Sequence, residues 1–377
     1  MKILVLGAAG KAAKAVIHSL RFLPAIERIY TADRDAEALC RQSADLVRIA
    51  VSPRYLDAGN ECSLRARMRE VDLVLGCLGP FHLHEGGIAR AAIAVGVDYL
   101  SLCDDVESTR EVMSLSPDAE RAGVRILCGC GLTPGLSDLL ARRACSRLDE
   151  TDAVELAWFL EPGPDLGAAT LEHLLHSYAV KAPVRRGGID RGARAGSWEE
   201  EVEFPPPVGT RFVSHLAHPE PLTLGGALAV TGDVWFKAGM GSRAKGLLLQ
   251  ALARLGEGAR TELERSSLHA VTAALARRGR PSFPTALRVT ARGTEKGGVM
   301  HRTLCVAGDY YRISGLVMAA AVEGMVRDSW APGVHTAHEV LDNPRFFAWL
   351  SRAGQRILVG EACAGGSGEG CFSPRAG

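Results

Sequence analysis

The first thirteen residues constrain the fold of this chain more than any other stretch. Residues 3–6 are four consecutive apolar residues, the pattern of a strand buried within a parallel sheet. The turn after them, Gly7-Ala8-Ala9-Gly10-Lys11-Ala12-Ala13, has small residues where a dinucleotide-binding turn needs them. Gly7 permits the tight turn, Gly10 lets the backbone approach a pyrophosphate, and Ala13 lets the next helix pack closely. We therefore predict a strand, a turn and a helix whose N-terminal amides bind a dinucleotide through Gly7, Ala8, Ala9, Gly10 and Lys11.

An aspartate follows at the distance that ribose recognition requires. A predicted helix over residues 11–23 stops before Pro24, and a second strand over residues 28–32 leads to Asp33, about 20 residues beyond the turn. A carboxylate there accepts a hydrogen bond from the ribose 2′-hydroxyl and repels a 2′-phosphate, which favours NAD. Arg34 could instead hold that phosphate, so NADP remains possible. The alternative is an ordinary strand–turn–helix unit in which Asp33 is a cap.

Composition limits the class of protein. A chain of 377 residues is long enough for two domains, and its net charge of +1 gives no electrostatic footprint for nucleic acid. No apolar stretch reaches the roughly 18 residues of a membrane span, and the N-terminus does not resemble a signal peptide. The ten cysteines are scattered, without a Cys-x-x-Cys pair. This distribution is typical of reduced thiols, so we expect a cytoplasmic protein with no membrane or nucleic-acid partner.

The strand pattern continues at intervals typical of βαβ units. Further strands are predicted over residues 46–51, 71–78, 98–102 and 124–130, with helices over residues 61–70 and 85–95. Six strands with helices between them predict an α/β fold, a Rossmann-type doubly wound parallel sheet. Because the carboxyl ends of parallel strands meet at one edge, we expect Gly7, Asp33, Gly79 and Asp104 to lie in one crevice.

The pattern changes after Cys130, where we expect an inserted α+β substrate domain. Strands are predicted over residues 154–160, 285–291 and 301–307, in a mostly antiparallel sheet with helices on one face. Helices are predicted over residues 136–148, 171–179, 311–327 and 345–353, with a long one inside residues 244–278. Residues 185–197, rich in Arg and Gly, are expected to form a loop, Pro205-Pro206-Pro207 an extended kink, and residues 365–377 a disordered tail.

Three motifs in this order resemble the saccharopine dehydrogenase-like NAD(P) oxidoreductases. They are the Gly7–Ala13 turn, Gly79-Pro80-Phe81-His82-Leu83-His84, and Gly131-Leu132-Thr133-Pro134-Gly135-Leu136-Ser137. Weaker similarities are His218-Pro219-Glu220-Pro221, and Gly333-Val334 with Glu339. The resemblance implies that a C-terminal segment returns to complete the nucleotide domain. The expected domains are then residues 1–130 plus about 329–364, and residues 131–328. It also implies a homodimer or homotetramer.

The resemblance implies chemistry at a carbon–nitrogen bond, either oxidation of an amine to an imine or reduction of an imine. This chain departs from the saccharopine-forming enzymes, which usually have Tyr at Phe81 and Asn-Glu-x-Gly-Leu-Asp-Pro-Gly where this chain has Cys128–Gly135. It is more similar to the lysine 6-dehydrogenase and carboxynorspermidine dehydrogenase branch. We therefore expect an NAD(P)-dependent dehydrogenase or reductase acting on CH–NH or CH–NH2 groups, with an amino acid or polyamine-like amine as substrate. The alternatives are a reductive condensing enzyme that joins an aldehyde to an amine, and a non-catalytic nucleotide-binding protein.

The remaining candidate residues divide by role. Hydride transfer is supplied by the cofactor, so the chain must handle a proton, and His84, Asp104 and Asp105 are the candidates. Their structural alternatives are a histidine that only begins a helix and aspartates that cap the next one. Gly79, Pro80 and Phe81 are expected at the cofactor, and Cys130, Thr133 and Pro134 at the substrate, although Cys130 also suits a buried structural thiol.

Two further sets of residues were considered as binding sites. Three His-x-x-His pairs occur, His173/His176, His215/His218 and His335/His338. None has a Glu-x-x-His or cysteine pair beside it, so we expect no metal site there. Arg185 and Arg186 could hold a substrate carboxylate or lie in a solvated loop.

Overall fold

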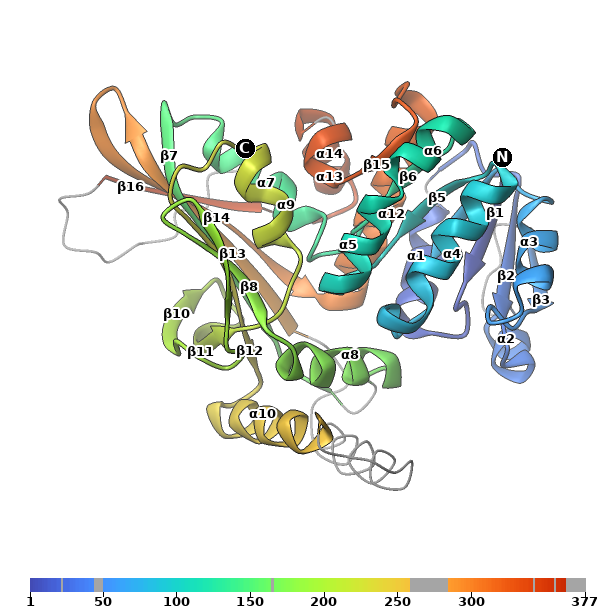
Figure 1. The fold of residues 1–377 in the computed structure, drawn as a ribbon, viewed down its shortest axis with the longest axis horizontal. Coiled ribbons are helices and arrows are strands. Elements are labelled where there is room, and N and C mark those ends of the chain that lie inside the picture. The colour runs from blue at the N-terminus through green and yellow to red at the C-terminus, as the bar shows by residue number, and fades with distance from the viewer. Residues whose placement is uncertain are drawn as a thin grey trace. The chain divides into compact units, whose positions relative to one another are not determined.

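The computed structural model describes residues 1–21, 23–43, 50–163, 166–257, 284–341, 343–355 and 357–363 (Figure 1). The chain forms two compact units. The first contains Met1–Leu136 and Tyr311–Ala353, and the second contains Ser137–Tyr310 and the residues after Ala353. Each unit has a sheet of its own.

The first unit is built on a parallel seven-stranded sheet. Its strands are β1 (Lys2–Leu6), β2 (Arg28–Asp33), β3 (Val51–Tyr55), β4 (Leu73–Gly76), β5 (Asp98–Ser101), β6 (Arg125–Leu127) and β15 (Gly333–His335). Their order in the sheet is β15-β6-β5-β4-β1-β2-β3, and every pair is parallel. The order reverses direction at β1 and β4, as in a doubly wound nucleotide-binding fold, so the predicted Rossmann-type class is confirmed.

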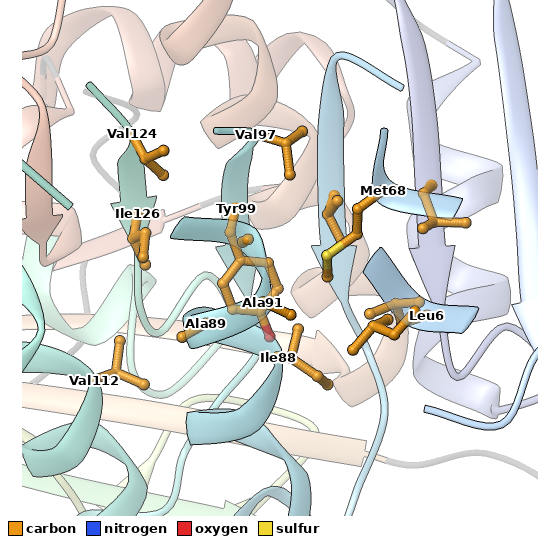
Figure 2. Close-up of a cluster of buried hydrophobic side chains, with 14 of the residues drawn as sticks. Leu6, Met68, Ile88, Ala89, Ala91, Val97, Tyr99, Val112, Val124 and Ile126 are labelled. Carbon is orange, nitrogen blue, oxygen red and sulfur yellow. The ribbon is translucent and has the colours of Figure 1, made fainter. Parts of the chain in front are cut away.

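Helices connect these strands. They are α1 (Lys11–Leu20), α2 (Ala36–Ser43), α3 (Glu61–Met68), α4 (Phe81–Val95), α5 (Val106–Ser114), α6 (Ser116–Ala122), α12 (Tyr310–Arg327), α13 (Ala337–Val340) and α14 (Asn343–Arg352). One core cluster joins apolar residues of α3, α4, α5 and α6 to the alternate residues of the strands that face them (Figure 2). Tyr99 lies fully buried near its centre, with Ile88, Ala89 and Val112 around it. This packing fixes one face of the sheet.

Helix α12 comes from the far end of the sequence and packs directly on α1. A Cβ atom added to Gly315 would lie 2.5 Å from the carbonyl oxygen of Ala15, so the two helix backbones are in close contact. Thirteen residues of α12 are buried. The C-terminal segment therefore belongs to the core of the first unit.

Three local predictions for this unit differ from the structure. The third strand is Val51–Tyr55, whereas residues 46–51 were expected, and residues 44–49 lie outside the described part. Pro53 is tolerated because β3 pairs with β2 alone and is an edge strand. Helix α4 begins at Phe81 instead of Glu85, and β15 was not predicted because three residues give too short a pattern.

The second unit contains a nine-stranded mixed sheet. Its strands are β7 (Glu150–Leu160), β8 (Ala182–Arg186), β9 (Ile189–Ala193), β10 (Glu200–Phe204), β11 (Gly209–His215), β12 (Asp233–Met240), β13 (Pro284–Glu295), β14 (Gly298–Asp309) and β16 (Ile357–Cys363). The main order is β10-β11-β12-β7-β13-β14-β16, with β8 paired to β12 and β9. Among the described pairs only β12 and β7 run parallel. The helices are α7 (Leu136–Cys145), α8 (Ala168–Ala179), α9 (Glu220–Ala227) and α10 (Arg243–Glu257).

Residues 185–197 are not the loop that their Arg and Gly content suggested. Strands β8 and β9 form a hairpin there, with Gly187 and Gly188 at positive φ in its turn. Two adjacent glycines are typical of a hairpin turn, and they indicate a hairpin here in place of a loop. Residues 205–208 are likewise a turn between the antiparallel strands β10 and β11.

The boundaries of the two units differ from those expected. The chain re-enters the first unit at Tyr311, before the expected residue 329, because all of α12 packs there. It leaves again after Ala353, and β16 pairs with β14 of the second sheet. The predicted tail of residues 365–377, and the end of the predicted helix inside residues 244–278, lie outside the described residues. Within the described residues, no helix has the length and apolar character needed to cross a membrane.

Candidate functional site

The turn between β1 and α1 has the geometry of a pyrophosphate cradle. Gly7 has a φ of +71°, and a Cβ atom there would lie 2.6 Å from the Cα of Leu78. Only glycine fits both the conformation and the space. The amide of Gly10 donates to the carbonyl of Gly7 (2.9 Å), and Gly10 is the N-cap of α1, with no acidic residue in the first turn. The amides of Ala8, Ala9 and Gly10 donate within the protein, so the anion-binding groups of this turn are the first amides of α1 and the positive end of its dipole.

Asp33 lies against this turn. It is the last residue of β2, and its Oδ2 accepts a hydrogen bond from the amide of Ala9 (3.0 Å). Its Oδ1 accepts one from the amide of Asp35 (3.1 Å). Both oxygens are held in place while each keeps a further lone pair for a ribose hydroxyl. Lys11, the first residue of α1, and Arg34, which follows Asp33, are both exposed.

The second predicted motif begins α4 at the carboxyl end of β4. Pro80 is the N-cap and follows a cis peptide bond with Gly79. Phe81 is partly buried and packs against the core cluster, so its ring has a packing role. His84 is half-buried in the first turn of the helix. Because β4 lies next to β1, this helix start and the Gly7 turn are at neighbouring strand ends.

The two aspartates after β5 have separate surroundings. Asp105 is the N-cap of α5, and its Oδ1 accepts a hydrogen bond from the amide of Ser108 (2.8 Å). The capping alternative therefore holds for Asp105. Asp104 is not the cap, and its side chain is buried.

The third motif forms a closed loop at the end of the first unit. The amide of Gly131 donates to the carbonyl of Pro134 (2.8 Å), and that of Leu136 donates to Gly131 (3.0 Å). Gly135 has a φ of +125°, and a Cβ atom there would lie 2.6 Å from the carbonyl oxygen of Gly131. The hydroxyl of Ser314 on α12 accepts a hydrogen bond from Leu132 (3.4 Å). Thr133 and Pro134 lie within this rigid loop, joined by a cis peptide bond.

Cys130 is buried directly before that loop. Its thiol donates to the carbonyl of Leu127 (3.5 Å), and burial raises its pKa well above that of a free thiol. Cys130 is therefore a neutral thiol, and its surroundings agree with the alternative that it is a buried structural residue.

Glu85 is a site residue that was not predicted. It follows His84 on α4 and is 1% exposed. The hydroxyl of Tyr99 donates to its Oε2 (2.9 Å). Burial raises the pKa of Glu85 to about 7, and the negative charges of Asp104 and Asp105 add to this rise, although hydrogen bonds oppose it. A buried carboxylate with a pKa near neutrality is typical of functional sites. The signal available in the sequence was a lone acid, followed by Gly86 and Gly87, on a core-facing helix.

The second unit contains a polar network of its own. Ser137 Oγ donates to Glu220 Oε1 (2.8 Å), and Glu220 Oε2 is hydrogen-bonded to His218 Nδ1. All three side chains are buried, and the ring of His218 stacks on Phe236 with centroids 4.1 Å apart. A carboxylate on Nδ1 fixes the tautomer and orientation of the imidazole. The sequence indicated this network only through the weak His218-Pro219-Glu220-Pro221 similarity, because Ser137 lies 83 residues away.

The arginines considered for substrate binding already have partners. Arg186 forms an ion pair with Asp233 (2.9 Å), and its guanidinium lies over the rings of Trp198 (4.0 Å) and Trp235 (4.5 Å). Arg185 lies 3.6 Å from Asp190 in the same hairpin. These contacts indicate that both arginines stabilise the second sheet.

Comparison with known proteins finds a family model that matches part of the first unit. The family model of the saccharopine dehydrogenase NADP binding domain matches residues 3–127. Among solved structures, saccharopine dehydrogenase (L-Glu forming) from Saccharomyces cerevisiae matches with a TM-score of 0.66 at 14% identity, over 96% of this chain and 99% of that one. The C. glutamicum DAP dehydrogenase in complex with DAP matches with a TM-score of 0.46 at 13% identity, over 92% and 95% of the two chains. Residues 3–127 thus match an NADP binding domain, and the chain shares the fold of the yeast protein over nearly its whole length.

Proposed function

We propose that this chain, whose first domain belongs to the saccharopine dehydrogenase NADP-binding family, is an NAD(P)-dependent oxidoreductase acting on a carbon–nitrogen bond. The observation that carries the proposal is the Gly7–Gly10 turn, with its free helix amides and with Asp33 hydrogen-bonded to Ala9. A protein that retained the fold without its cofactor would have no need of these features together.

The proposed substrate is an amine or amino acid. When bound, the nicotinamide accepts or donates the hydride, and the chain must bind, orient and manage one proton. In the oxidative direction a hydride leaves carbon, a proton leaves nitrogen, and an imine forms. His84 and Asp104 are the proposed proton acceptors, because they follow β4 and β5 at the carboxyl edge of the sheet.

The relative with a shared fold supports an amino-acid type of substrate. The yeast protein is a saccharopine dehydrogenase that forms L-Glu, and it matches nearly the whole of this chain. Here Phe81 has no hydroxyl, and the Gly131–Gly135 loop has Thr133 where saccharopine-forming enzymes usually carry an acid. Fewer charged groups at these positions suit a substrate with fewer charges, so an amine or a simple amino acid is proposed ahead of saccharopine.

Two measurements test the proposal in order. Titration with NADH and NADPH should give saturable binding, with NADH tighter because the fixed Asp33 carboxylate repels a 2′-phosphate. With the oxidised cofactor supplied, the absorbance of the reduced cofactor should then rise for one or more members of a panel of diamines and amino acids. With the reduced cofactor supplied, it should instead fall for matching pairs of aldehyde and amine. If a cofactor binds but no member of the panel is turned over, the alternative of a non-catalytic nucleotide-binding protein holds. If neither cofactor binds, the proposal is refuted.

A further inference from the structure

Three ligand-type side chains converge inside the first unit, away from the nucleotide turn. One carboxylate oxygen of Glu85 and the sulfur atoms of Cys103 and Cys128 all lie within 4.8 Å of one another. Glu85 is the fifth residue of α4, and Cys103 and Cys128 lie just after the ends of β5 and β6. Their exposed fractions are 1%, 0% and 3%, so water does not reach the cluster from outside.

A second observation concerns the hydrogen bonds of Glu85. Tyr99 donates to Oε2 and Ser101 also hydrogen-bonds to the carboxylate, whereas Oε1 is a buried atom with no hydrogen-bond partner of its own among the residues that the structure describes. A buried carboxylate oxygen without a partner is costly and calls for a ligand. Burial raises the pKa of the neighbouring Cys103 thiol well above its ordinary value.

We propose that Glu85, Cys103 and Cys128 bind a borderline-soft divalent cation of the Zn²⁺ class. Two sulfurs and one carboxylate oxygen are ligands that Zn²⁺ prefers. Tetrahedral coordination at about 2.3 Å to sulfur and 2.0 Å to oxygen places ligand atoms roughly 3.5 Å apart, so shifts of about 1 Å bring the three side chains onto the ion, and the fourth position falls to a water molecule bound with it.

The surroundings supply an outer shell. The hydroxyl of Thr109 on α5 lies 4.0 Å from the sulfur of Cys103 and 3.9 Å from that of Cys128, and can donate to a thiolate. Tyr99 orients the carboxylate through Oε2. Outer groups of this kind hold ligands in position and raise metal affinity.

Charge and protons balance for such a site. Binding converts two thiols to thiolates and keeps Glu85 ionised, so two protons are released from the thiols and the loaded site carries a net charge of −1. Structural zinc sites with four cysteines carry −2, so this charge is within the known range. The cation would join β5 and β6 to α4 behind the strand ends. The cation has no part in the proposed dehydrogenase reaction, although Cys103 precedes Asp104 and Glu85 follows His84 in the chain.

The full-length protein is suited to a direct test. Metal analysis of protein expressed with added Zn²⁺ and then desalted should give about one zinc per chain. Addition of Cd²⁺ to chelator-treated protein should produce the ultraviolet thiolate-to-cadmium charge-transfer band at the same stoichiometry. Cys103→Ser and Cys128→Ser should each lower the affinity for Cd²⁺ at least about 100-fold, and Glu85→Gln about tenfold or more.

Cys145→Ser is the matched control, because Cys145 is a buried thiol of the second unit with a raised pKa. It should bind Cd²⁺ as the wild type does. If the wild-type protein contains no zinc and gives no charge-transfer band with Cd²⁺, the proposal is overturned by that result alone. Wild-type affinity in Cys103→Ser would also overturn it, as would mass spectra showing that the two thiols form a disulfide instead of binding metal. Bound NADH reports folding of the variants separately.

Discussion

Glu85 makes the stability of this protein depend on pH in a defined direction. Its pKa is about 7 in the folded chain against an ordinary 4.5, because burial disfavours the charged form. Between these values the folded state binds more protons than the unfolded state, so stability falls as pH rises and is lowest above about pH 7. The loss amounts to at most about 3 kcal/mol.

Replacement of Glu85 by Gln removes this titration. In urea unfolding with a chelator present, the wild type should lose stability between about pH 5 and 8, while Glu85→Gln should show a flatter profile. Glu70→Gln is the control, since Glu70 is an exposed residue paired with Arg67, and it should keep the wild-type slope. Parallel profiles for wild type and Glu85→Gln would show that Glu85 is ionised normally.

Proton transfer in the proposed reaction is also a property of single residues. His84→Ala or Asp104→Asn should lower kcat by about 100-fold and leave the affinity for NADH nearly unchanged, because neither residue lies in the pyrophosphate turn. His18→Ala, at an exposed histidine of α1, should retain full turnover. Wild-type turnover in both site variants across about pH 6 to 10 would exclude them as proton acceptors.

The first turn and helix act together as one binding element. Gly10→Val should abolish binding of NADH, because a Cβ atom added there would lie 3.1 Å from the carbonyl oxygen of Gly7 and a branched side chain would block the approach of the pyrophosphate. Gly87→Ala is the matched control, since nothing lies within 4 Å of a Cβ atom there. It should bind NADH normally and raise stability by about 0.5 to 1 kcal/mol. Equal NADH titrations for the two variants would contradict this role of the turn.

Elements with a strong local pattern were predictable from the sequence. The apolar strand β1 and the acid at the end of β2 both follow directly from residue spacing. Elements that depend on distant partners were not. Strand β15 has three residues and is defined by pairing with β6. The β8–β9 hairpin is local, but its Arg and Gly content favoured a loop although Gly187 and Gly188 signal a hairpin turn. Dependence on distant partners also hid the cluster of Glu85, Cys103 and Cys128, since only the parallel arrangement of β5 and β6 and the start of α4 bring them together.

At the scale of the whole molecule, the first domain is assembled from two ends of the chain. Strand β15 extends the sheet beside β6, and Arg125 on β6 donates to the carbonyl of Met325 on α12 (3.3 Å). The family resemblance implied such a return, but its starting point at Tyr311 could not be read from the sequence, because a buried helix has the same apolar pattern in either domain. Binding of the cofactor should therefore depend on residues more than 300 positions from the glycine turn.

Gly315→Val tests this dependence. The added side chain meets the backbone of Ala15 at 2.5 Å, and backbone atoms cannot move aside as a side chain does, so α12 should be forced off α1. We expect a loss of about 3 kcal/mol or more in stability, together with weaker NADH binding, because α1 carries the pyrophosphate amides. Gly324→Ala on the same helix meets only side-chain atoms, the end of Leu341 at 3.0 Å and the ring of Trp330 at 3.4 Å, and should cost much less. Thermal unfolding and NADH titration of both variants measure the two effects, and a Gly315→Val protein that binds NADH like the wild type would mean that the C-terminal helix does not support the cofactor turn.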